Sequence, residues 1–200
     1  MEGIRMTERW MEQVEQKRKR GNQILFDRSS VLLQPLIDLI CVQNHRAIVL
    51  WCLDCMETIL AEIQHIDPME TRAKEAVCQC QLWSAGEIRM PQAKKAILAA
   101  HEIAKESDDP VLAAYAHAIG QGCASVHCET HAIGMVFYDL TAMIRRYGLD
   151  QRVITERVRW YEEKLNEWQD REKRISRKWA AFLMKERPNK EARRKIEKAR

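Results

Sequence analysis

The sequence is poor in the residues that interrupt helices and in those that favour strands. Its 200 residues include only seven glycines and five prolines, and aromatic side chains make up 6%. Alanine, leucine, isoleucine, methionine, glutamate, lysine and arginine dominate, and these residues favour helices. The composition therefore predicts an all-α fold, arranged as a compact multi-helix bundle or array.

Long apolar runs are also missing. No stretch reaches the roughly 18 apolar residues that a spanning helix needs, and residues 1–20 lack the uninterrupted apolar segment of a signal peptide. The seven cysteines are an odd number, and several sit inside apolar runs. Such thiols are typical of a reducing compartment. We therefore expect a cytoplasmic protein with no membrane association and no disulfides.

The chain lacks the context that specific catalytic motifs require. Cys52 and Cys55 form a C-x-x-C, but no second pair follows at zinc-finger spacing and no βαβ pattern surrounds them. Two such thiols on an apolar helix are more often small buried side chains. Gly120 and Gly122 lie in a helical run with no strand before them, unlike a phosphate-binding loop. These motifs predict no cofactor.

A dense group of histidines and cysteines is present in GQGCASVHCETHAIG, residues 120–134. His127 and His131 have the i, i+4 spacing of zinc proteases, but Cys128 stands where those enzymes carry their general base. Thr130 is a reasonable N-cap for a following helix. In that case the two histidines lie on either side of a helix break.

A second interpretation of this group is a metal site. His101 and His117 belong to the two preceding predicted helices and could converge with His127, His131 and Cys128. Imidazole suits zinc, iron and nickel, so such a cluster would make the chain a metal-binding protein or a metal-dependent enzyme. Histidines on helix faces more often make structural hydrogen bonds. The metal site is therefore kept as the alternative interpretation.

Capping residues locate the helices before the C-terminal region. We expect helices over residues 1–20, from Ser29 or Ser30, from about Asn44, from Asp67–Pro68, over residues 91–107, from Asp109–Pro110, and from Thr130 to Gly148. The third of these, AIVLWCLDCMETILAEI, is apolar on nearly every face. It should lie buried at the centre of the fold.

After residue 150 the pattern becomes a heptad seam. Its positions are Ile154, Val158, Tyr161, Leu165, Trp168, Glu172, Ile175, Trp179 and Phe182, and only Glu172 breaks the apolar pattern. This predicts one amphipathic helix from Asp150 to about Lys185, about 50 Å long at 1.5 Å per residue. We expect it to pack on a helical core domain formed by residues 1–150, or to pair with a second copy as a homodimer through residues 150–185. The polar tail after Pro188 should fray.

Charge is distributed unevenly along the chain. Residues 151–200 carry 17 basic and 9 acidic side chains, whereas residues 1–150 carry 16 basic and 20 acidic ones. A basic end can bind nucleic acid by displacing counterions from phosphate. The acids are interleaved with the bases, however, which is typical of a solvated helix face. Nucleic acid is therefore not the expected partner.

One region, residues 78–144, carries a longer pattern of residues. Its members are Trp83, Gly86, Glu87 and Ile88; Ala99, Ala100 and His101; Asp109 and Pro110; and Gly120, His127, His131, Ala132, Gly134 and Tyr138. This pattern resembles that of the helical bacterial family called putative immunity proteins. Three positions that are alanine in the family pattern are Gly122, Met135 and Val136 here.

The resemblance implies a compact helical cytoplasmic protein that binds and neutralises a partner toxin without catalysis. The polar cluster that it points to is called here the signature residues: Trp83, Glu87, His101, His117, His127 and His131. No resemblance or spacing indicates which toxin is bound.

Overall fold

The computed structural model describes residues 2–185 and 187–198, with side chains from Arg9 onward. The α-helices are α1 (Glu2–Lys19), α2 (Gln34–Val42), α3 (His45–Ile66), α4 (Arg72–Ser84), α5 (Met90–Glu106), α6 (Pro110–Ala124), α7 (Ala132–Tyr147), α8 (Gln151–Arg171) and α9 (Lys190–Lys198). Two short 3-10 helices, η1 (Val31–Leu33) and η2 (Glu129–His131), precede α2 and α7. Strands are absent from the described residues, and the all-α prediction is confirmed.

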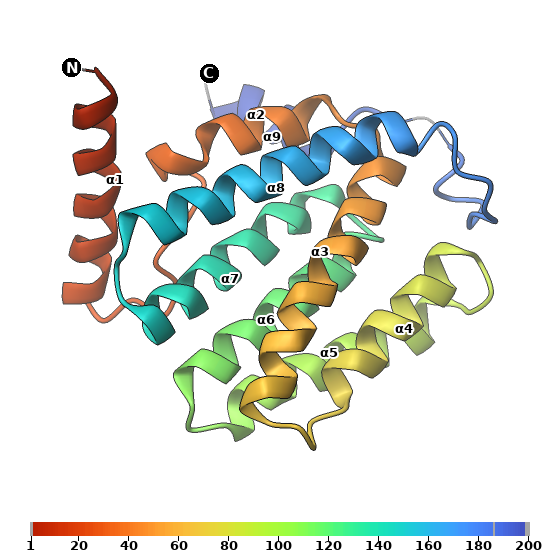
Figure 1. Cartoon of the computed structure of the whole chain (residues 1–200). Coiled ribbons are helices and arrows are strands. Elements are labelled where there is room, and N and C mark those ends of the chain that lie inside the picture. Colours follow the sequence, from red (N-terminus) through yellow and green to blue (C-terminus); the bar gives the residue numbers. More distant parts are fainter. Residues whose placement is uncertain (1, 186, 199–200) are drawn as a thin grey trace.

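Helix α3 lies at the centre of the array (Figure 1). Its side chains are buried on nearly every face from Ala47 to Met56, as its apolar sequence predicts. It packs against α6 on one side and α8 on another, and it also contacts α4 and α7. The helix begins where expected, because the Asn44 side chain accepts a hydrogen bond from the Ala47 N–H at 2.9 Å.

Helices α4, α5, α6 and α7 follow one another in space as they do in sequence, each packed against the next (Figure 1). Local signals set several of their ends. The Asp109 carboxylate accepts a hydrogen bond from the Val111 N–H at 2.7 Å and caps α6, and Gly148 ends α7 with a φ of 83°. None of the helices in the described part of the chain combines the length and apolar character needed to cross a membrane.

The predicted start of the fourth helix is wrong. Asp67 ends α3, and its carboxylate accepts a hydrogen bond from the Met69 N–H at 3.0 Å in a turn. Helix α4 begins only at Arg72, whose N–H and guanidinium both bind the Glu70 carboxylate. The Asp-Pro pair therefore closes a turn between two helices, a use that these two residues suit equally well.

The prediction of one helix from Asp150 to about Lys185 is also wrong, because α8 ends at Arg171. The next side chain, Glu172, turns inward and is 5% exposed. It pairs with Arg46 at 2.6 Å and accepts a hydrogen bond from the Asn44 amide at 3.2 Å. No glycine or proline marks this end, so contacts with the start of α3 end the helix rather than a local signal.

The seam on α8 is covered by the chain itself. Its five members within the helix are all buried: Ile154, Val158, Tyr161, Leu165 and Trp168. The indole of Trp51 donates to the Tyr161 carbonyl at 3.0 Å, and the indole of Trp168 donates to Asp54 at 2.9 Å. These two hydrogen bonds join α8 to α3. A homodimer through this seam would therefore have to displace α3.

The tail after Pro188 forms α9 instead of fraying. The Asn189 side chain accepts hydrogen bonds from the N–H groups of Glu191 and Ala192, which caps the helix. The same side chain donates to the Ile40 carbonyl of α2 at 2.7 Å. Glu191, 2% exposed, pairs with Arg28 at 2.7 Å. A helix cap and an ion pair with a buried carboxylate therefore stabilise a helix that buries little apolar surface of its own.

Candidate functional site

The stretch 120–134 forms the junction between α6 and α7. Helix α6 ends at Ala124, and the N–H groups of His127 and Cys128 both bond to the Ala124 carbonyl. The predicted helix break is therefore present, and His127 and His131 lie on either side of it. Thr130 does not cap α7 as predicted. It lies inside η2, where its hydroxyl is 3.1 Å from the Cys128 thiol.

Two of the signature residues, His101 of α5 and His117 of α6, hydrogen-bond each other. Their Nδ1 atoms are 2.9 Å apart, so one ring donates and the other accepts. The His117 ring also faces Tyr138 of α7, with 4.9 Å between ring centroids. Gly120 makes room for this arrangement, because a Cβ there would lie 2.3 Å from the His101 ring. The three consecutive helices are joined through these rings.

His131 makes a separate link between α6 and the start of α7. Its Nδ1 is 2.9 Å from the side-chain oxygen of Gln121. Gly134 makes room for the glutamine, because a Cβ there would lie 2.7 Å from that same oxygen. The two glycines of the family pattern, Gly120 and Gly134, thus each leave space for one polar contact.

The three histidines of this region are held neutral. Burial is the main cause that lowers the pKa of His101 to about 4, and repulsion from His117 and His131 adds to it. Burial likewise lowers the pKa of His117 and of His131. The bond between His101 and His117 needs at least one neutral ring, since two protonated rings would oppose two N–H groups.

The other signature residues lie elsewhere. His127 stacks on Trp83 at the end of α4, with centroids 6.4 Å apart, and Phe182 packs on the other side of Trp83 at 5.7 Å. Glu87 is exposed in the loop before α5. The signature residues therefore form three separate structural contacts and one surface position.

The candidate metal ligands named from the sequence take part in separate contacts. Among the residues whose placement is described, no three histidine, cysteine or acidic side chains are grouped as ligands for one ion. Cys128 bonds to Thr130, away from the bond between His101 and His117. Burial raises the pKa of Cys52 to about 12 and raises that of Cys55, so both thiols stay protonated. The C-x-x-C is part of the buried core, as its apolar surroundings predict.

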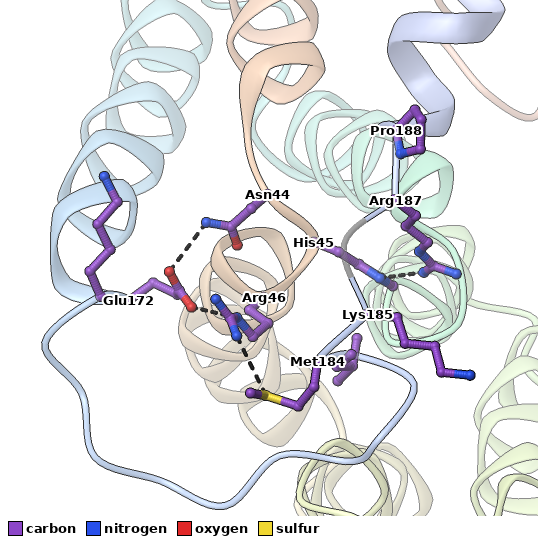
Figure 2. A pocket seen from close by; sticks show the side chains of 10 residues that line it. Asn44, His45, Arg46, Glu172, Met184, Lys185, Arg187 and Pro188 are labelled. Carbon is purple, nitrogen blue, oxygen red and sulfur yellow. Dashed lines mark hydrogen bonds and ion pairs between the residues drawn. The ribbon is translucent and has the colours of Figure 1, made fainter.

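A hollow that the sequence did not reveal lies between the start of α3 and the chain after α8 (Figure 2). It has a volume of about 580 Å³. Its lining residues are Asn44, His45, Arg46, Glu172, Lys173, Leu183, Met184, Lys185, Arg187 and Pro188. Figure 2 shows the Arg46 guanidinium between Glu172 and the Met184 sulfur, to which it donates at 3.4 Å.

Two residues that line this hollow, His45 and Arg187, also lie near a buried acid, Glu129. Glu129 of η2 is 1% exposed, and one of its oxygens accepts a hydrogen bond from the Lys190 N–H at 2.6 Å. The other oxygen lies 3.5 Å from the Arg187 guanidinium and 3.9 Å from His45 Nε2. Arg187 also contacts His45 Nδ1. The junction, α3 and the C-terminal chain therefore meet at Glu129.

Charge and hydrogen bonding keep Glu129 ionised. Burial raises its pKa, but backbone N–H groups and the charge of Arg187 outweigh this, so the pKa is lowered overall. Burial lowers the pKa of His45, whose Nε2 donates to the Ser125 carbonyl at 2.7 Å. The sequence showed only an acid within a cysteine and histidine stretch. Its partners are more than 50 residues away in the chain, so no local spacing could identify this group.

The fold and the junction together define an all-α protein whose family pattern serves to pack consecutive helices. The model of the family described as "Imm-5 like putative immunity protein" matches residues 38–168. This is more than half of the chain, and the protein belongs to that family. The match runs from α2 almost to the end of α8 and includes all of the signature residues. Comparison with curated proteins and with solved structures found no match.

Proposed function

We propose that this protein binds a cognate bacterial toxin and neutralises it by stoichiometric protein–protein binding. Membership of the Imm-5 like family is the observation that carries this proposal. The contacts of the family pattern agree with such a role, because bonds such as those of His101 to His117 and of His131 to Gln121 link helices to one another. A rigid helical scaffold suits a protein that acts by presenting a surface.

The proposal is tested with the product of the gene next to this one. Expression of that product alone should stop the growth of the host, and co-expression of this protein should restore it. The two purified proteins should then elute as one complex from a size-exclusion column, with a 1:1 ratio by light scattering. Growth arrest that this protein does not relieve, together with separate elution, would refute the proposal.

A matched control separates binding from mere expression. The variant Cys78→Ser changes an exposed thiol on α4 and should protect as well as the wild-type protein. The variant Leu165→Asp places a charge in the buried seam of α8 and should abolish protection through unfolding. Equal protection by both variants would show that the folded protein is not the protective agent.

A further inference from the structure

In the C-terminal segment, defined here as residues 172–185 and 187–198, most basic side chains are exposed and two acidic side chains are buried. Its acids Glu172 and Glu191 point inward and pair with Arg46 and Arg28 of the core, at 2.6 and 2.7 Å. Nearly all of its lysine and arginine side chains are exposed, and Glu197 is the one exposed acid among the segment's described residues. Two acids of the segment, Glu172 and Glu191, are therefore turned away from the surface. The outer face of the segment is strongly basic.

This basic face is hollowed where the chain turns after α8. The ion pair between Arg46 and Glu172 lines both the hollow of about 580 Å³ and a neighbouring one of about 410 Å³. Lys173 also lines both hollows, and Lys185 lines the larger one. Both lysines are exposed, and neither is paired with a described acidic side chain. Two cations thus border a concave surface.

Apolar side chains are exposed among these charges. Met184 is 55% exposed beside the larger hollow, and Ile175 is 38% exposed beside the smaller one. The Arg177 guanidinium lies over the Trp179 ring at 4.3 Å. Methionine, arginine and tryptophan are enriched at the centres of protein interfaces. A surface that binds only phosphate has no need for exposed aliphatic groups.

We propose that the C-terminal segment is the surface that binds the toxin, and that it fits an acidic surface carrying apolar side chains. This rests on the proposed function. The family match ends at residue 168, so the segment lies outside the part that this chain shares with the family model. A surface that selects one cognate partner has to differ between members of the family. This segment can differ, because it lies outside the part that the family model describes. Lys173 and Lys185 receive the partner's carboxylates at the rim, while Met184 packs against its apolar groups.

The test compares charge reversal on this surface with an equal reversal elsewhere. The variant Lys173→Glu/Lys185→Glu should weaken binding of the neighbouring gene's product by about tenfold or more, mainly through a slower association rate. The control Lys74→Glu/Lys105→Glu carries the same change on exposed positions of α4 and α5 and should alter the dissociation constant less than about twofold. Biolayer interferometry at low and high salt measures both. Thermal unfolding confirms that each variant is folded.

The outcomes separate this inference from the proposed function. If the wild-type protein binds the toxin and the two double variants bind it equally, the C-terminal surface is refuted while the proposed function stands. If the wild-type protein does not bind the toxin, the proposed function fails. The surface is then judged with a fluorescein-labelled peptide of alternating glutamate and leucine, whose binding Lys173→Glu/Lys185→Glu should abolish. No peptide binding by the wild-type protein would overturn the surface as well.

Nucleic-acid probes test whether the basic face binds phosphate groups in place of an acidic protein surface. Fluorescein-labelled duplex DNA and polyuridylate are titrated at the same salt as the acidic peptide. We expect both to bind more weakly than the peptide, because the exposed Met184 and Ile175 contribute nothing to phosphate contacts. Tighter binding of either nucleic acid, lost in Lys173→Glu/Lys185→Glu, would overturn the proposal and assign the basic face to nucleic acid.

Discussion

Asp139 of α7 holds a buried ion pair, and a small substitution there should destabilise the protein strongly. Its carboxylate is 1% exposed and accepts hydrogen bonds from Arg157 Nε at 2.9 Å and from the Tyr161 hydroxyl at 2.8 Å. Both donors are on α8. The Arg157 side chain is itself only 13% exposed and lies over the Trp160 ring at 4.2 Å. The variant Asp139→Asn would leave this guanidinium buried without a counter-charge.

The contacts set the expected size of the effect. Removing one partner of a buried ion pair costs about 3–5 kcal/mol. Arg157 keeps its stacking on Trp160 and a small exposed area. The loss of unfolding free energy in Asp139→Asn should therefore lie at the lower end of this range, about 3 kcal/mol. For a chain of this length, 1 kcal/mol shifts Tm by roughly 2–4 °C, which predicts a fall of roughly 6–12 °C. Tyr161→Phe removes one hydrogen bond and should cost only about 1–2 kcal/mol.

Urea unfolding followed by circular dichroism measures these differences, with differential scanning fluorimetry for Tm. The double variant Asp139→Leu/Arg157→Met replaces the pair with apolar groups and should be more stable than Asp139→Asn alone. A loss below about 1 kcal/mol for Asp139→Asn, or a double variant less stable than the single one, would refute the assignment of the buried charge to Arg157.

Three further predictions concern the region from α5 to α7. The pKa of His101 is about 4 in the folded chain against an ordinary 6.5, so the unfolded chain takes up this proton first as the pH falls. The contribution of His101 to the free energy of unfolding is therefore fully present above pH 6.5, and this free energy falls by about 1–2 kcal/mol towards pH 5. His101→Gln should flatten a plot of Tm against pH there, whereas exposed His65→Gln should not. Asp109→Ala removes the α6 cap and should cost about 1 kcal/mol in urea unfolding. Gly120→Ala meets the His101 ring at 2.3 Å and should cost about 1–3 kcal/mol, partly recovered by adding His101→Ala.

Local sequence determined most of the helices. The caps at Asn44 and Asp109 and the helix end at Gly148 depend on a side chain or backbone angle within a few residues, and all three are where the sequence predicts them. The central place of α3 follows from its apolar faces, which have to be buried somewhere. Asp67 shows the limit of this reasoning, because an Asp-Pro pair suits a turn as well as a helix start.

The candidate site was predicted only in part. Sequence spacing indicated a helix break between His127 and His131, and the break is present. It could not indicate which histidines meet, because that depends on how α5 and α6 pack. The structure brings His101 to His117 and sends His127 to Trp83 instead. His101 and His117 therefore share one contact, while His127 and His131 each make a different one.

The sequence by itself determined an all-α chain, its family and a basic C-terminal region. Only the tertiary structure decided where α8 ends and which way the charges after it point. Glu172 and Glu191 turn inward because each pairs with a partly buried arginine far away in the chain, Arg46 and Arg28 respectively. A buried ion pair forms only when both partners are brought together, so no local pattern predicts it. That pairing is what leaves the outer face of the C-terminal segment basic.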